Sequence, residues 1–271
     1  HDIYHVYVEE NLPGGVERGS TMPTPLTPAL KKEYSDIVRI SRWGSGAGEL
    51  VRYKDKELDL DTRAVDPDFL DMFSFPVITG NKKQPLNELT DVAITEKCAK
   101  NLFGAEDPVG KTIEMKMEGE WRAMQVSAVL KDFPVNSSFR FDILTRFENF
   151  PYYKQNIDPW DNSNHDVFVQ LQKSVTQASM EKRLPAFSEL YMKNKIKDLK
   201  RDGAKPDADG AYIRLRLLPL TDMHFSNISN TGAGVNRFYP YLLLIISGFI
   251  LFIACVNFVY LSLAPSFTPA K

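Results

Sequence analysis

The sequence is poor in cysteine and histidine and has almost no net charge, and each shortage excludes a class of protein. Its 271 residues include only two cysteines, Cys98 and Cys255, so no disulfide framework supports the fold. A formal net charge of -2 argues against nucleic-acid binding, which usually needs a basic face. The four histidines are scattered without a second ligand at zinc-site spacing: His1, His5, His165 and His224.

Catalytic motifs are missing as well. The sequence has no Gly-x-Ser-x-Gly elbow and no other recognisable setting for a nucleophile. The Gly-rich turn 44–48 is followed by a strand-like segment from Leu50, whereas a dinucleotide-binding loop needs a helix there. The sequence therefore predicts no catalytic residue, no metal site and no cofactor held by this chain.

Residues 105–112, A-E-D-P-V-G-K-T, satisfy a permissive nucleotide-binding pattern. A phosphate loop functions because a helix N-terminus follows it and faces the anion. Here the following residues alternate between apolar and polar, which predicts a strand. Glu106 and Asp107 would also repel phosphate. An enzyme that uses Lys111 and Thr112 to bind a nucleotide remains the alternative.

Charge is absent from residues 238–270. The mostly apolar stretch 241–263 is long enough to cross a bilayer core of ~30 Å as a helix. Tyr239, Tyr241 and Tyr260 lie near its ends, where interfacial aromatic residues belong. The alternative is a buried core helix, but such helices are rarely apolar on every face. We therefore predict a transmembrane helix over residues 238–264, after a water-soluble region 1–237 and before a short stub 265–271.

The sequence begins at His1 without a basic segment or a signal sequence. Two arrangements are compatible with this start. The protein could be anchored by its C-terminal helix alone, or the chain could be a fragment that lacks an upstream membrane helix. The residues do not decide between them.

Hydrophobic patterns before residue 238 predict a mixed fold with two strand–helix–strand units and a mainly β insertion between them. The elements of the first unit are strand 3–8, a helix capped by Thr27 that begins at Pro28, and strand 37–43. The elements of the second unit are strand 167–171, a helical stretch 176–199 kinked at Pro185, and strand 212–218. One apolar face of that helical stretch is expected to contain Met180, Leu184, Phe187, Leu190 and Tyr191.

Within the insertion, strand 92–94 leads into a helix that Thr95 caps and that ends near Phe103. Residues 112–130 read as a hairpin, and residues 139–144 alternate as a further strand.

Small and polar residues recur in the predicted membrane helix. Such residues let transmembrane helices approach closely, and a polar amide can form a hydrogen bond between them. We therefore predict a surface that packs against partner helices, although a passive anchor with incidental small residues is the alternative. The predicted packing residues are Ser247, Gly248, Ala254, Cys255, Asn257 and Ser262.

Four blocks of sequence resemble the MacB-like ABC transporter permeases. Residues 103–111 (F-G-A-E-D-P-V-G-K) and 126–134 (V-S-A-V-L-K-D-F-P) are similar to parts of their extracytoplasmic core domain. Residues 218–224 look like the segment before their next membrane helix. Residues 253–264 resemble the start of their FtsX-like permease module. The blocks occur in the order of the family and cover nearly the whole chain.

The resemblance implies an α+β fold with porter-like strand–helix–strand units and an inserted smaller α/β subdomain, followed by one transmembrane helix. The implied division of the periplasmic core domain 1–237 is porter-like parts 1–65 and 146–220, and an inserted subdomain of about 66–145. The chain would then lie between the first membrane helix of a four-helix permease subunit and a point just after the second.

The resemblance also implies function. ATP bound to a partner ATPase closes a permease dimer, and the membrane helices transmit the motion to the periplasmic domain. The resemblance implies that this motion exports or extracts substrate at the bacterial inner membrane. A periplasmic adaptor and an outer-membrane channel are possible further partners. A membrane-tethered sensor or ligand-binding domain without an ATPase is the alternative function.

One departure from the family pattern concerns the C-terminal stub. Pro265 and Pro269 stand where the family usually has arginines that lead into its cytoplasmic coupling region. Proline would end the helix there, and only Lys271 on that side balances Arg237 on the other. The contacts to an ATPase therefore cannot be read from this chain.

Overall fold

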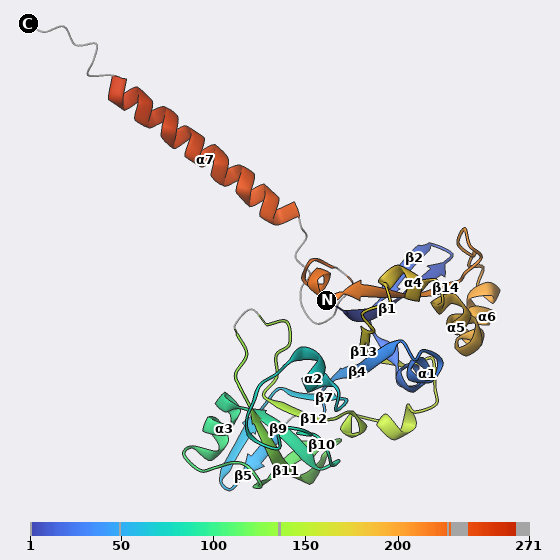
Figure 1. Cartoon of the computed structure of the whole chain (residues 1–271), viewed down its shortest axis with the longest axis vertical. Coiled ribbons are helices and arrows are strands. Elements are labelled where there is room, and N and C mark those ends of the chain that lie inside the picture. Colours follow the sequence, from blue (N-terminus) through green and yellow to red (C-terminus); the bar gives the residue numbers. More distant parts are fainter. Residues whose placement is uncertain (1, 49, 135–136, 227, 229–237, 264–271) are drawn as a thin grey trace, which may run out of the picture.

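The computed structural model describes residues 2–48, 50–134, 137–226, 228 and 238–263. A twisted sheet forms the body, and one long helix, α7, extends away from it (Figure 1). The main path of the sheet runs β14-β1-β13-β4-β7-β12-β9-β11-β10-β5-β6. The strands β2, β3 and β8 pair at its sides with β1, β13 and β11.

The strands have the following bounds: β1 Ile3–Leu12, β2 Gly15–Gly19, β3 Met22–Pro23, β4 Ile37–Ser45, β5 Leu50–Tyr53, β6 Lys56–Asp59, β7 Thr62–Val65, β8 Val77–Gly80, β9 Asp91–Thr95, β10 Thr112–Met117, β11 Glu120–Leu130, β12 Ile143–Arg146, β13 Ser163–Leu171 and β14 Ile213–Pro219. The α-helices are α1 Leu26–Glu33, α2 Phe69–Phe73, α3 Glu96–Phe103, α4 Gln177–Glu181, α5 Leu184–Tyr191, α6 Lys193–Arg201 and α7 Phe238–Leu263. Three 3-10 helices complete the described elements: η1 Phe147–Asn149, η2 Tyr153–Gln155 and η3 Leu220–Phe225.

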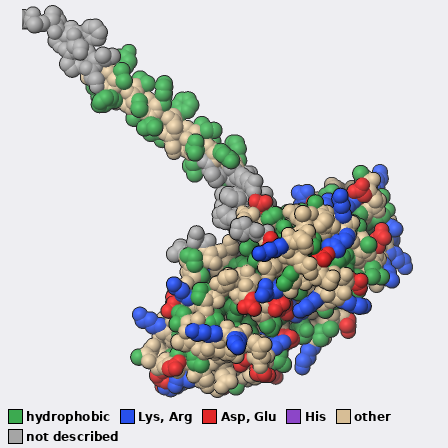
Figure 2. All heavy atoms as spheres, in the orientation of Figure 1, with side chains coloured by type: hydrophobic (Ala, Val, Ile, Leu, Met, Phe, Trp, Pro, Cys, Tyr) green, Lys and Arg blue, Asp and Glu red, His purple; other side chains and the backbone are tan. Residues whose placement is uncertain are grey.

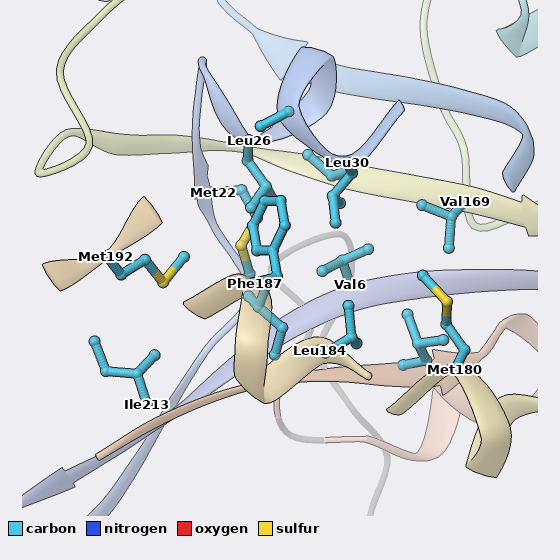
Figure 3. Close-up of a cluster of buried hydrophobic side chains, with 14 of the residues drawn as sticks. Val6, Met22, Leu26, Leu30, Val169, Met180, Leu184, Phe187, Met192 and Ile213 are labelled. Carbon is cyan, nitrogen blue, oxygen red and sulfur yellow. The ribbon is translucent and has the colours of Figure 1, made fainter. Parts of the chain in front are cut away.

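Helices α1 and α4–α6 pack on the end of the sheet that contains β14, β1, β13 and β4. Their apolar side chains meet those of the strands in one cluster, in which Val6, Leu26, Leu184 and Phe187 are buried (Figure 3). Burying an apolar side chain of this size contributes roughly 1.5–3 kcal/mol, so the cluster fixes the helices on the sheet.

Three further clusters lie in the body, the smallest of which contains Ala47, Ala64, Phe147 and Phe150. An aromatic cluster surrounds Phe69 and includes Trp43, Phe139, Phe168 and Met223. A third cluster packs α3 against β9, β10 and β11. The aromatic cluster contains residues from β4, β13 and η3 and also from β9, β11 and β12, so it joins the two ends of the sheet.

The mixed α+β fold class predicted from the sequence is confirmed, and so are most of the predicted elements. The helix capped by Thr95 is α3, and the Thr95 Oγ1 accepts a hydrogen bond from the Cys98 amide at 3.2 Å. The predicted hairpin 112–130 is formed by β10 and β11. The sheet path continues through the predicted subdomain boundaries near residues 65 and 145, and those boundaries remain predictions.

Four local predictions were wrong. The strand predicted over residues 3–8 continues to Leu12 as β1, and the chain turns back at Gly15, whose φ is +137°, into β2. Helix α1 begins at Leu26 after Pro25, and the Thr27 hydroxyl is buried within it instead of capping it. Residues 139–142 are not a strand, because Phe139 and Phe141 enter the aromatic cluster without a neighbouring strand.

The fourth correction concerns the helical stretch 176–199, which consists of three short helices. Pro185 lies in the first turn of α5, where its missing amide costs nothing, so it begins a helix and does not kink one. Each helix buries its own residues, and Leu190 is 52% exposed outside the expected apolar face.

Candidate functional site

Helix α7 is the element that carries most of the predicted site. Residues Tyr241–Leu261 have a mean hydropathy of 2.8, and none of this span is buried. Figure 2 shows α7 covered with apolar side chains, whereas Lys, Arg, Asp and Glu are spread over the body. A core helix would be buried, and a free apolar surface of this size marks an interaction with a membrane or a partner. The helix is long and apolar enough to span a bilayer.

The structure places the predicted packing residues on the surface of α7. Ser247, Gly248, Ala254, Cys255 and Asn257 are all exposed, while the side chain of Ser262 lies outside the described residues. The Ser247 hydroxyl donates a hydrogen bond to the Leu243 carbonyl at 2.8 Å, which satisfies it inside the helix.

Helix geometry arranges these residues in two columns. At 3.6 residues per turn, positions seven apart lie almost above one another. One column therefore contains Ser247 and Ala254, with Asn257 beside it, and the neighbouring column contains Gly248, Cys255 and Ser262. Together the two columns give α7 a surface of small and polar residues, and its role in packing remains a prediction.

The segment between the sheet and α7 is anchored to the body. Strand β14 pairs with β1 over seven positions, and the pair Tyr4–Pro219 lies where β14 ends. In η3, which follows directly, Met223 is buried and belongs to the aromatic cluster. The last described elements before α7 are therefore fixed to both the sheet and the core.

The strand predicted after residues 105–112 is confirmed. These residues lead into β10, so no helix begins directly after the loop as it would in a phosphate loop. Lys111 binds Glu106 at 3.0 Å, and Lys54 binds the same carboxylate at 2.6 Å. Hydrogen bonds from these two lysines lower the pKa of Glu106 to about 2. The lysine that a phosphate would need is therefore paired with a carboxylate.

The Gly-rich segment 44–48 is likewise followed by a strand, as predicted, because β5 begins at Leu50.

Two buried titratable groups, Cys98 and His165, are held in unreactive forms. Burial raises the pKa of the Cys98 thiol to about 12, so the thiolate nucleophile is absent at neutral pH. Burial also lowers the pKa of His165 to about 3, with a further contribution from the Arg42 charge, so this ring stays neutral. Among the described residues, no three His, Cys, Asp or Glu side chains come together in a way that could hold a metal ion.

Sequence analysis missed two buried polar contacts. His5 Nε2 lies 2.9 Å from Asp166 Oδ1, between residues 161 positions apart. Arg42 binds Asp66 through two hydrogen bonds, Nε to Oδ2 at 2.9 Å and Nη2 to Oδ1 at 2.6 Å. No sequence motif marks either contact, because each joins strands or loops that only the fold brings together.

The fold and α7 together define a class of protein, a mixed α+β domain attached to a membrane-length helix. A family model described as the MacB-like periplasmic core domain matches residues 1–187, which is more than half of the chain. The chain belongs to the MacB-like periplasmic core domain family, a family of ABC-type permease domains.

A solved structure with a TM-score above 0.5 shares the fold. A domain assigned to a permease protein from Porphyromonas gingivalis is 22% identical with a TM-score of 0.66, and the match covers 80% of this chain and 89% of that one. The periplasmic region of MacB from Actinobacillus actinomycetemcomitans is 15% identical over 73% of this chain and 94% of its own, with a TM-score of 0.48.

The extracellular domain of the noncanonic ABC-type transporter YknZ from Gram-positive bacteria is 14% identical over 79% of this chain and 98% of its own, with a TM-score of 0.49. With TM-scores below 0.5, the MacB and YknZ structures add nothing to the family assignment. A search of curated proteins finds no match.

Proposed function

We propose that this chain is the periplasmic domain and one membrane helix of a permease subunit that transmits ATP-driven conformational change to the periplasm. The ATP is bound by a partner ATPase, two permease subunits form a dimer, and the motion exports or extracts substrate at the bacterial inner membrane. A periplasmic adaptor and an outer-membrane channel are possible further partners of this proposed assembly. The observation that carries the proposal is the continuous hydrogen-bonded path from β14 through the whole sheet.

That path provides a mechanical connection. Strand β14 leads into η3 on the side of α7, and seven residue pairs join it to β1. Strand β1 pairs with β13 over four positions, and β13 pairs with β4 over six. Movement of α7 would therefore act on a strand that is hydrogen-bonded to the rest of the sheet, because backbone ladders resist sliding of neighbouring strands.

The aromatic cluster supplies a second connection. Met223 of η3 is 4% exposed and lies in the same cluster as Phe69 of α2 and Phe168 of β13. Packed cores shift between discrete arrangements and do not deform continuously. A displacement at η3 would thus be passed to the part of the sheet beyond β4.

The proposed transmission is tested in the full-length protein, purified in mild detergent from its native membrane. We expect a stoichiometric ATPase subunit to copurify and to hydrolyse ATP. A spin label attached to a cysteine at Leu89, which is 53% exposed, should then report a different distance between the two subunits with a non-hydrolysable ATP analogue than with ADP.

The spin label must attach only at the cysteine introduced at position 89. Of this chain's two cysteines, Cys98 is buried and its pKa is about 12, so only the exposed Cys255 is replaced. Serine is used there because it keeps a small side chain on the predicted packing surface, and exposed cysteines elsewhere in the full-length protein are replaced in the same way. A folded, dimeric sample without an ATPase, or a label distance unaffected by nucleotide, contradicts the proposal and favours a tethered binding domain.

The exposed surface of α7 is proposed to pack against membrane helices of the permease dimer. Leucine at Gly248 or at Asn257 is expected to weaken assembly, because a bulky side chain blocks close approach and loses the amide hydrogen bond. Replacement of Phe249, which is 66% exposed and lies on the opposite side of the helix from the two columns, by leucine is the control. Dimer content is measured by light scattering in detergent, with circular dichroism to show that the soluble domain stays folded. Unchanged dimerisation in both leucine variants contradicts this role.

A further inference from the structure

A cavity lies where α5 and α6 meet the turn that enters β14, at one end of the body (Figure 1). Its volume is about 350 Å³, within the range of ligand-binding pockets. The lining residues are Pro185, Glu189, Lys193, Ile196, Lys197, Lys200, Gly210, Ala211, Tyr212 and Ile213. The proposed transport role does not use this cavity.

The α6 helix concentrates positive charge at the cavity. Its nine residues, K-N-K-I-K-D-L-K-R, include five basic side chains and one acidic side chain. The whole chain has a formal net charge of -2. The charge of α6 is therefore a local feature, and it does not reflect the composition of the protein.

The basic residues of α6 divide into paired and unpaired groups. Lys195 pairs with Glu10, and Arg201 pairs with Asp198 and Asp202. In the part of the chain that the structure describes, no ion pair involves Lys193, Lys197 or Lys200. All three are exposed, and all three line the cavity.

These three lysines share one face of the helix. Their spacing of four and then three residues places them in one row. Lys200 Nζ also lies 5.0 Å from the centre of the Tyr212 ring across the cavity. Like charges at such spacing repel one another, so the lysine row favours a ligand that brings negative charge between them.

The opposite wall of the cavity is mostly apolar. Ile213 is 2% exposed, and Pro185 and Tyr212 are half-buried. Figure 3 shows Ile213 near Met192, at the margin of the hydrophobic cluster that holds α5 on the sheet. Glu189 is the one acidic residue among those that line the cavity. A suitable ligand is therefore negative on the α6 side and apolar on the other.

An extended peptide has this character if acidic and apolar residues alternate along it. Successive side chains of a strand point to opposite faces, and every second one lies about 6.6 Å further along. A helix rises ~1.5 Å per residue, so Lys193 and Lys197 are offset by about 6 Å along α6. Carboxylates at alternate positions of the peptide would match the lysine row, while the intervening apolar side chains would face Ile213.

We propose that this cavity is a groove that binds an extended segment of a partner protein in which acidic and apolar residues alternate. A lipid headgroup would offer similar charge, but α6 lies at the end of the body away from α7, as Figure 1 shows. With α7 in the membrane, as proposed above, the cavity faces the aqueous side, where a protein segment can reach it.

The test uses the full chain in non-ionic detergent and a peptide with fluorescein on its N-terminus, fluorescein-Glu-Leu-Glu-Leu-Glu-amide, with binding followed by fluorescence anisotropy at low salt. The double variant Lys197→Glu/Lys200→Glu is expected to bind at least about tenfold more weakly, a loss of roughly 1.4 kcal/mol. Glu189→Gln should strengthen binding about two- to threefold, because it removes a negative charge that repels the acidic peptide. The effect is small because interactions between exposed charges are weak. Lys31→Glu on α1, an exposed lysine outside the groove, is the matched control and should leave affinity unchanged.

Two matched peptides separate the contributions of charge and apolar contact. Replacement of every glutamate by glutamine should abolish binding, and replacement of every leucine by serine should weaken it. The proposal is overturned if the acidic peptide does not bind, or if the double variant binds it as well as the original protein does. Tighter binding to phosphatidylglycerol vesicles through the same lysines would overturn it in favour of a lipid surface. None of these readouts requires an ATPase, so failure here is distinct from failure of the transport proposal.

Discussion

Replacing Phe69 with alanine is expected to lower the free energy of unfolding by about 3–5 kcal/mol, the range for large-to-small changes of a buried aromatic residue. Phe69 is fully buried at 0% exposure. Its ring stacks on Trp43 at a centroid distance of 5.1 Å and meets Phe139 edge-on at 5.3 Å. The alanine variant would leave a cavity among rings that come from separate segments, and these rings cannot all move inward to fill it.

The measurement is urea-induced unfolding of the full chain in detergent, followed by tryptophan fluorescence. Phe69→Leu keeps most of the apolar volume and should cost less than the alanine variant. Leu89→Ala, at a residue that is 53% exposed, should change stability by less than about 0.5 kcal/mol. A Phe69→Ala loss no larger than that of Leu89→Ala would show that the aromatic cluster does not hold the body together.

The same variant bears on the proposed transmission. Met223 of η3 belongs to the cluster that surrounds Phe69. A loosened cluster should therefore weaken the connection between η3 and the far part of the sheet before it unfolds the β14–β1 pair.

Local signals in the sequence were sufficient for many elements. The Thr95 side chain accepts a hydrogen bond from the backbone amide three residues further on, so the start of α3 could be predicted. The alternation after Lys111 predicted β10 and excluded a phosphate loop. Length and apolar composition alone predicted α7, because a membrane span is defined by those two properties.

Predictions failed where tertiary contacts decide the conformation. Phe139 and Phe141 alternate as in a strand, but their burial comes from the aromatic cluster and not from a neighbouring strand. Leu190 has helical spacing, yet it lies about a third of a turn from the face on which α5 buries Leu184 and Phe187, and it is exposed. A pattern of apolar residues therefore predicts the burial of most of its side chains. It does not determine which elements of the fold cover them.

The residues of the candidate site also differ in whether the sequence could predict them. The small and polar residues of α7 could be identified from sequence because they stand out in an apolar helix. The groove beside α6 could not, because its lysine row looks like an ordinary solvated face. Only the fold brings residues 210–213 opposite that row and separates the paired lysine, Lys195, from the unpaired ones.

The second large effect is expected at Asp66. Alanine at this position should destabilise the fold by about 3–5 kcal/mol, because it leaves the Arg42 guanidinium buried without its partner. The Arg42 side chain is 8% exposed and that of Asp66 is 14% exposed. Burial lowers the pKa of Arg42, but the hydrogen bond and the charge of Asp66 outweigh it and raise this pKa. Asp66 also accepts a hydrogen bond from the Arg42 backbone amide at 2.7 Å.

The position of this ion pair links stability to the proposed function. Strand β4 is joined to β7 by only three residue pairs, and there the sheet passes from the end that contains β14 to the end that contains β10. Arg42 lies on β4, and Asp66 directly follows β7. The ion pair therefore clamps a short junction through which movement of β14 would have to pass.

Adding a second substitution, Arg42→Met, to Asp66→Ala distinguishes the loss of this clamp from the cost of an unpaired charge. The variant Arg42→Met/Asp66→Ala should be more stable than Asp66→Ala alone, since it removes the buried cation together with its partner. Asp202→Ala breaks the exposed pair with Arg201, whose side chains are 68% and 58% exposed, and it should cost at most about 1 kcal/mol. Unfolding in urea gives all three values. If the double variant were less stable than Asp66→Ala, the Arg42 side chain would stabilise the junction mainly by packing on the Phe147 ring, whose centre lies 4.0 Å from the guanidinium carbon, and the ion pair would not be the clamp.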